Sequence, residues 1–162
     1  MCVSDCVTVG LYSDVSSSRT CVADCNPLGL TPWADDSTRR CVSDCNNTIA
    51  KYLADNTTMK CVYDCPLTHV ADFTTTAPKC VVTCPSGWFA DDTPGSYKIC
   101  VQRCPDSPPK FGDTAGGLNL CVSVCTMGTY GDETGNRLCR QACPRPYYSQ
   151  NDTLRRCVKI CN

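Results

Sequence analysis

The chain has 162 residues, of which 18 are cysteines, and its 15 basic and 16 acidic residues give a formal net charge of −1. This interspersed, nearly neutral charge argues against nucleic acid and anionic lipid as partners, and the apolar stretches are too short to span a membrane. The cysteine density is typical of a disulfide scaffold, in which small secreted modules are stapled because they cannot build a large core.

A C-x-x-x-C pair recurs nine times with a period of 18 to 21 residues, and it accounts for all 18 cysteines. None is left for a separate catalytic role. The period predicts one array of about eight modules, approximately residues 2–20, 21–40, 41–60, 61–79, 80–99, 100–120, 121–138 and 139–156, with 157–162 starting the next. Because the chain opens and stops inside a repeat, we expect a fragment of a longer array.

Each module is predicted to form one short β-hairpin. In the clearest copy, a bulky residue, a small residue and an aspartate (Phe89-Ala90-Asp91) precede a turn signal and the β-prone run 97–101. In chain order, the equivalent first strands are expected at 12–14, 33–35, 53–55, 70–72, 89–91, 111–113, 130–132 and 148–150. Variable lengths place a loop before the bulky residue and a turn after the aspartate. The expected fold class is therefore small and disulfide-rich, with tandem β-hairpin modules stacked into an elongated rod and little or no helix.

A list of cysteines does not fix their connectivity, but the repetition narrows it. Bridges within C-x-x-x-C would leave the long segments unconstrained. Joining the second cysteine of one pair to the first of the next closes 13 to 16 intervening residues, which is worth roughly 3 kcal/mol per loop in the chain-entropy estimate. We predict Cys6–Cys21, Cys25–Cys41, Cys45–Cys61, Cys65–Cys80, Cys84–Cys100, Cys104–Cys121, Cys125–Cys139 and Cys143–Cys157, with the mates of Cys2 and Cys161 in adjoining modules.

The segment 84–92, C-P-S-G-W-F-A-D-D, closed by Cys100 and followed by C-V-Q-R-C, resembles the furin-like repeat of growth-factor-receptor cysteine-rich regions. It is also similar to the C-P-x-G-x-Y-A-D units of cysteine-rich surface proteins of ciliated protozoa. The resemblance covers all eight modules and implies single-disulfide modules stacked in a rod, with no shared catalytic site. The departures are Asn26 and Asn46 in place of proline, Val70 in place of the aromatic, and Gln150 in place of the aspartate.

Metal binding is an alternative use of the cysteines and aspartates. The C-x-x-x-C spacing fits zinc, but the chain has a single histidine, His69, and we favour disulfides. Calcium needs six to eight converging oxygens, more than pairs such as Asp35-Asp36 offer. We favour Asx-turns, in which the carboxylate accepts a nearby backbone N–H, and we expect no metal and no cofactor.

The aromatic residues could form a ladder that binds sugar or another ligand. We favour a packing role, in which each ring covers a disulfide and contacts the next module's valine, for Tyr12, Trp33, Phe89, Phe111, Tyr130 and Tyr148. No nucleophile–base set, paired-carboxylate pocket or phosphate-cradling loop is present in the sequence, and we expect no enzymatic activity.

Three N-x-S/T sequons begin at Asn46, Asn56 and Asn151, all in predicted loops or turns. With the cysteine framework they favour the secretory route, N-linked glycans and an extracellular or cell-surface location. We expect a structural repeat segment of a glycosylated filament or surface coat, whose partners are neighbouring repeats or copies of the same chain. The alternative is the stalk or ligand-binding ectodomain of a cell-surface receptor or adhesin.

Overall fold

The computed structural model describes residues 6, 10–14, 20–25, 32–46, 53–93, 95, 97–150 and 153–159. The chain divides into two units, Met1–Val81 and Val82–Asn162. Among the described residues, regular structure consists of short strands of two to four residues and one 3-10 turn, η3 (Ala115–Gly117). The prediction of a small disulfide-rich fold of tandem hairpins with almost no helix is confirmed.

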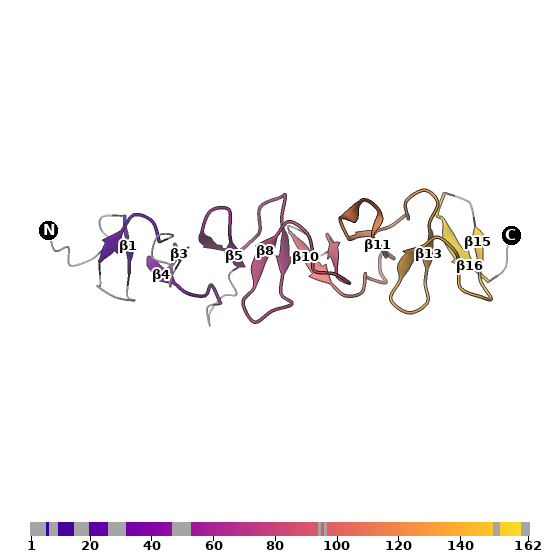
Figure 1. Ribbon diagram of the computed structural model, residues 1–162, viewed down its shortest axis with the longest axis horizontal. Helices are drawn as coiled ribbons and strands as arrows, with labels where there is room; N and C mark the ends of the chain where they lie inside the picture. The colour runs from indigo at the N-terminus through magenta and orange to yellow at the C-terminus, as the bar shows by residue number, and fades with distance from the viewer. Residues whose placement is uncertain are drawn as a thin grey trace. The chain divides into compact units, whose positions relative to one another are not determined.

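Each unit is a series of antiparallel hairpins that follow one another along the chain (Figure 1). In unit 1 they are β1(Tyr12–Ser13) with β2(Cys21–Val22), β3(Trp33–Asp35) with β4(Arg40–Val42), β5(Leu53–Asp55) with β6(Lys60–Val62), and β7(Val70–Asp72) with β8(Lys79–Val81). In unit 2 they are β9(Phe89–Asp91) with β10(Lys98–Val101), β11(Phe111–Asp113) with β12(Leu120–Val122), β13(Tyr130–Asp132) with β14(Leu138–Arg140), and β15(Tyr148–Gln150) with β16(Arg156–Val158).

The register explains the repeated residues. The bulky residue of the first strand lies opposite the residue that follows the cysteine, as in Trp33↔Val42 and Phe89↔Val101. The small residue lies opposite the cysteine, as in Ala90↔Cys100. Aromatic and β-branched residues placed directly across from one another stabilise an antiparallel pair. The valine after the cysteine therefore stabilises the hairpin by packing against the bulky residue of the first strand.

Successive hairpins are joined by parallel pairing. The first strand of one hairpin pairs with the second strand of the next, giving β1·β4, β3·β6 and β5·β8 in unit 1 and β9·β12, β11·β14 and β13·β16 in unit 2. The strand order is β7-β8-β5-β6-β3-β4-β1-β2 in unit 1 and β15-β16-β13-β14-β11-β12-β9-β10 in unit 2. Within each unit the named strand pairings join hairpins adjacent in sequence, as in a solenoid. The elongation of the whole array stays a prediction.

Eight disulfides join the second cysteine of one pair to the first cysteine of the next, which is the pairing expected from the repeat. Their Cα–Cα distances lie between 5.3 and 5.6 Å, and they are Cys6–Cys21, Cys25–Cys41, Cys45–Cys61, Cys65–Cys80, Cys84–Cys100, Cys104–Cys121, Cys125–Cys139 and Cys143–Cys157. Cys2 and Cys161 lie outside the described residues. No helix in the part of the chain that is described is long and apolar enough to cross a membrane.

Candidate functional site

The recurring site is the contact between one hairpin and the next, which we call the junction. At the junctions within each unit, among the described residues, the small residue of a first strand donates its backbone N–H to the carbonyl of the residue two positions before the next hairpin's cysteine. Six such bonds of 2.7–3.0 Å are formed, Ser13→Arg39, Ala34→Met59, Ala54→Pro78, Ala90→Asn119, Gly112→Arg137 and Gly131→Arg155. The junction thereby satisfies a backbone donor that would otherwise be left at the edge of the hairpin.

The accepting residue usually has a left-handed backbone. Five of the six acceptors have a φ of 47–55°, namely Arg39, Met59, Asn119, Arg137 and Arg155. The sixth is Pro78, whose ring restricts φ to negative values. Side chains other than glycine, asparagine and aspartate rarely adopt this region, so only Asn119 carries a sequence signal for it.

A ring from one hairpin lies directly on the small residue of the next. A Cβ built on Gly112 would lie 2.6 Å from Cζ of Phe89, and one on Gly131 would lie 2.7 Å from Cζ of Phe111. Both rings are buried, and Phe111 is fully so. The sequence shows that a small residue recurs at this position, and the close approach of the ring from the preceding hairpin explains why a larger side chain would not fit.

The same rings cover disulfides. Tyr12 lies in one buried cluster with Ala34 and the Cys25–Cys41 disulfide, and Val22 packs against this cluster. Phe89 belongs to an equivalent cluster with the Cys104–Cys121 disulfide. The predicted packing of aromatic residues on a disulfide and a valine is confirmed at these positions, and the disulfide concerned is the one that closes the following hairpin.

The prediction is wrong for Tyr148, which is 60% exposed. In the described part of unit 2 no hairpin follows β15, so no disulfide is present for this ring to cover. The packing of an aromatic side chain therefore depends on the next hairpin in the array.

Arginines complete several junctions. The guanidinium of Arg137 lies 4.9 Å from the ring centroid of Phe111, and that of Arg39 lies 5.6 Å from the ring centroid of Tyr12. Nε of Arg137 also donates to the Lys110 carbonyl at 3.1 Å, and its Nη1 pairs with Asp106 at 2.9 Å. A cation over the face of an aromatic ring is attracted by the ring quadrupole, so these arginines fasten one hairpin to the previous one.

The repeated aspartate forms the predicted Asx-turn. Its Oδ1 accepts the backbone N–H two residues later at 2.8–3.2 Å in six hairpins, at Asp35, Asp55, Asp72, Asp91, Asp113 and Asp132. All six aspartates are buried. The carboxylate is therefore a structural acceptor that starts the hairpin turn.

Hydrogen bonding lowers the pKa of three of these carboxyls. Burial raises the pKa of the Asp55 carboxyl, but the backbone N–H of Thr57 and the hydroxyl of Thr58 outweigh burial and hold the pKa below its ordinary value. The same balance, with hydroxyls of neighbouring residues as donors, lowers the pKa of Asp35 and Asp113. A hydrogen-bonded carboxylate of this kind stabilises the fold in its charged form.

In unit 1 an ion pair extends the contact over three hairpins. The hydroxyl of Tyr12 hydrogen-bonds to Asp36, and Nζ of Lys60 lies 3.1 Å from Oδ2 of the same carboxylate. The hydrogen bond from Tyr12, followed by Lys60, lowers the pKa of Asp36, although burial opposes it. In unit 2, Lys110 pairs with Asp91 at 3.0 Å and also contacts Asp92. These pairs link successive hairpins in addition to the backbone.

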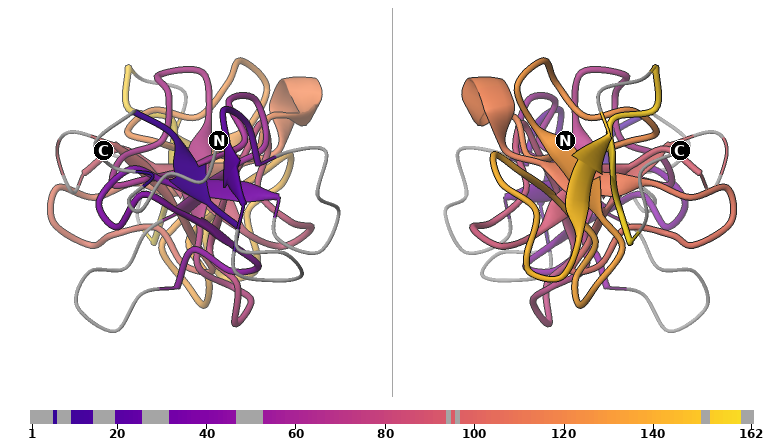
Figure 2. Two further views of the ribbon diagram at one scale, coloured as in Figure 1. Left: turned by 90° about the vertical axis from the view of Figure 1, so that its left-hand side faces the viewer. Right: turned by 90° about the vertical axis from the view of Figure 1, so that its right-hand side faces the viewer.

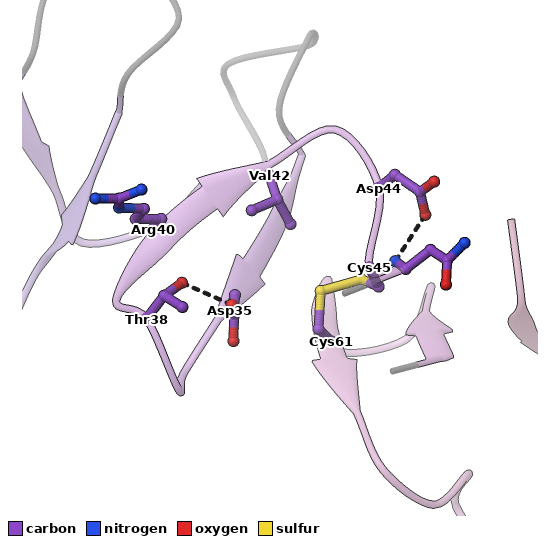
Figure 3. A pocket seen from close by; sticks show the side chains of 8 residues that line it. Asp35, Thr38, Arg40, Val42, Asp44, Cys45 and Cys61 are labelled. Carbon is purple, nitrogen blue, oxygen red and sulfur yellow. Dashed lines mark hydrogen bonds between the residues drawn. A yellow bond between two sulfur atoms is a disulfide. The ribbon is translucent and has the colours of Figure 1, made fainter. Parts of the chain in front are cut away.

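A hollow of unit 1 lies beside the junction between β3–β4 and the next disulfide (Figure 3). It has a volume of about 300 Å³, is open to solvent, and is lined by Asp35, Thr38, Arg40, Val42, Asp44, Cys45, Asn46 and Cys61. Its carboxylates serve the local turns: Thr38 donates to Asp35 at 2.6 Å, and the Asn46 N–H donates to Asp44 at 2.9 Å. Among the described residues no cluster of three or more metal-ligating side chains is present.

Two of the three predicted glycosylation sites can be placed. Asn46 and Asn56 are exposed, and Asn56 lies in the turn between β5 and β6. The hydroxyl of its sequon threonine, Thr58, donates to Asp55 at 2.8 Å. Asn151 lies outside the described residues.

Comparison with models of protein families, with curated proteins and with solved structures finds no match to this chain. The likeness to furin-like repeats therefore stays an interpretation of the residues quoted above. Multiple disulfides are typical of extracellular and secreted proteins.

Proposed function

We propose that this chain is a structural repeat segment of an extracellular, glycosylated filament or surface coat. In this role it connects modules mechanically and catalyses no reaction. Its partners are neighbouring repeats or copies of the same chain, together with the glycans that it carries.

The repeated junction carries this proposal. Six times among the described residues, one hairpin donates a backbone hydrogen bond to the next. Rings stack on small residues and disulfides at these contacts, as at Phe89 and Gly112. Six buried aspartates accept the backbone hydrogen bond that starts the turn of their hairpin. A chain whose residues are devoted to linking successive modules suits a spacer or fibre, whose length is set by the number of repeats.

Immunogold electron microscopy of the native material tests the proposal, with antibodies raised against the oxidised chain. We expect label along extracellular fibres or over a surface layer. Label confined to intracellular compartments contradicts the proposal. Label restricted to single molecules that are embedded in a cell membrane supports the receptor or adhesin stalk instead.

The glycan is tested separately by intact mass before and after treatment with peptide N-glycosidase. We expect a mass loss, with conversion of asparagine to aspartate at Asn46, Asn56 or Asn151. An unchanged mass would contradict the N-linked glycan only, and the structural role would then be tested by the microscopy alone.

A further inference from the structure

The loop between β7 and β8 carries three consecutive threonines. It runs over residues 73–78, with the sequence F-T-T-T-A-P, and is two residues longer than the loops 36–39 and 56–59 of the two preceding hairpins. Residues 75–77 are exposed, and Thr74 is half-buried. In each unit the loops of the hairpins extend away from the strands (Figure 2).

In other hairpins, hydroxyls of the loop donate to the buried aspartate that starts the turn. Thr58 donates to Asp55 at 2.8 Å, and Thr38 donates to Asp35 at 2.6 Å. Equivalent bonds to the aspartate of the same hairpin are made by Ser37, Thr93 and Thr134. These hydroxyls are therefore engaged in the turn once the hairpin has folded.

The threonines of the β7–β8 loop are used differently. Oδ1 of Asp72 accepts the backbone N–H of Thr74 at 2.9 Å, and no hydroxyl of a described residue donates to this carboxylate. The hydroxyl of Thr75 donates to the Ala77 carbonyl at 2.9 Å. The hydroxyl of Thr76 makes no hydrogen bond within the part of the chain that the structure describes. Of the three threonines, Thr76 is thus the one that combines exposure with an unengaged hydroxyl.

We propose that Thr76 is an O-glycosylation site, to which a glycosyltransferase adds a sugar after the hairpin has folded. Oγ1 of Thr76 bonds to the anomeric carbon of a nucleotide-activated sugar, the bond from that carbon to the nucleoside diphosphate breaks, and the hydroxyl proton passes to a base of the transferase. Segments rich in serine and threonine with proline are typical of O-glycosylated stalks. The proline here, Pro78, is buried, and its carbonyl accepts the N–H of Ala54 at 3.0 Å. The loop is therefore held at its end while Thr76 stays accessible.

The site adjoins one of the predicted N-linked sites. Nδ2 of Asn46 lies 3.5 Å from the carbonyl oxygen of Thr76. Because an N-linked glycan is attached through Nδ2, sugars on Asn46 and Thr76 would cover the same part of unit 1. The inference rests on the proposed function, since an O-linked sugar deepens the glycosylated, extracellular role and requires the secretory route.

Peptide mapping of the chain purified from its native source tests the proposal. After reduction, alkylation and treatment with peptide N-glycosidase, trypsin releases residues 61–79, which hold the three loop threonines and no N-linked sequon. We expect this peptide to carry the added mass of at least one sugar, and electron-transfer fragmentation to assign the sugar to Thr76. Thr58, in the tryptic peptide 52–60, is the internal control and should carry no sugar, because its hydroxyl is donated to Asp55.

Two variants expressed in the same cells separate the threonines of the loop. Thr76→Ala should abolish the sugar on the peptide 61–79. Thr75→Ala is the matched control in the same exposed loop and should leave the sugar in place. Non-reducing mass mapping verifies that both variants keep the eight disulfides.

An unmodified peptide 61–79 overturns the inference, as does a sugar on Thr58 or a sugar that Thr76→Ala retains. These results are distinguishable from a failure of the proposed function. Extracellular fibres that are labelled by antibody and whose chain lacks the sugar remove only the inference. A sugar on Thr76 of a chain found only as single molecules in a cell membrane supports the inference and contradicts the structural role.

Discussion

Adding a methyl group at Gly112 tests whether ring packing holds the junction together. In Gly112→Ala the new Cβ would lie 2.6, 2.7 and 2.8 Å from three carbons of the Phe89 ring. Carbon atoms in good contact are about 3.5–4.0 Å apart, so the ring would have to retreat by roughly 1 Å. Phe89 is 4% exposed and packs in a cluster with Cys104 and Cys121. Overpacking of this kind costs about 1–3 kcal/mol of stability.

A smaller side chain at Phe89 should relieve the clash. Unit 1 offers the precedent, because Leu53 and Ala71 occupy the equivalent positions of two successive hairpins and both are buried. Phe89→Leu destabilises the unaltered chain by the loss of the ring. The double variant should be more stable than the sum of the two single effects predicts, by on the order of 1 kcal/mol.

Amide hydrogen exchange gives the local free energy of opening, which suits a repeat array that need not unfold in one step. The readout is the amide at position 112, whose N–H donates to Arg137 at 2.7 Å. Ser123→Ala, an exposed position after β12, is the control and should change stability by less than about 0.5 kcal/mol. If Gly112→Ala behaves like this control, or if its effect simply adds to that of Phe89→Leu, then the ring does not constrain the junction.

Three further predictions concern the carboxylates, the disulfides and the glycan. The pKa of Asp55 lies below its ordinary value in the fold, so its contribution to stability is present above the unfolded-state pKa of about 3.9 and is lost as pH falls through the lower folded value. The melting temperature should therefore fall at acidic pH, and it should fall less in Asp55→Asn. EDTA should leave the melting temperature unchanged. Replacing Cys84 and Cys100 together by serine should cost about 2–5 kcal/mol in urea unfolding, and an effect below 1 kcal/mol would contradict the stapling role. Asn56→Gln should remove one glycan mass at unchanged stability, Thr58→Ser should keep both the glycan and the hydrogen bond to Asp55, and equal glycan mass in all three chains would exclude this site.

Features that depend on neighbouring residues could be predicted from the sequence. The run Phe89-Ala90-Asp91 and the turn after it define a hairpin locally, and β9 and β10 form there. The Asx-turn is also local, because the carboxylate and its N–H donor are two residues apart. Periodicity made the disulfide pairing predictable, since every module repeats the same order of cysteines at intervals of 13 to 16 residues.

The contacts between hairpins could not be predicted in the same way. The parallel pair β9·β12 joins residues that are 30 positions apart, Ala90 and Leu120, and no local propensity specifies such a register. The left-handed backbone of Met59 runs against the preference of its side chain. The junction imposes it, because the carbonyl of this residue must reach the N–H of Ala34.

One signal for the junction was nevertheless present in the sequence. Glycine holds the small position at Gly112 and Gly131, and in both cases the preceding module carries a phenylalanine. Where the preceding module carries Leu53, the small position of the next module is Ala71. At these two junctions the small residue is therefore matched to the phenylalanine of the module before it, whereas alanine follows the aromatic residues Tyr12 and Trp33. A comparison between adjacent modules, rather than within one module, would have indicated that the ring packs forward on the next hairpin.

This forward packing explains why the modules occur in series. A hairpin of two short strands is at best marginally stable alone, and its own disulfide closes the base without covering the aromatic side chain. The ring becomes buried only when another hairpin follows, as the contrast between Phe111 at 0% and Tyr148 at 60% exposure shows. Within each unit, a hairpin is thus completed by its successor.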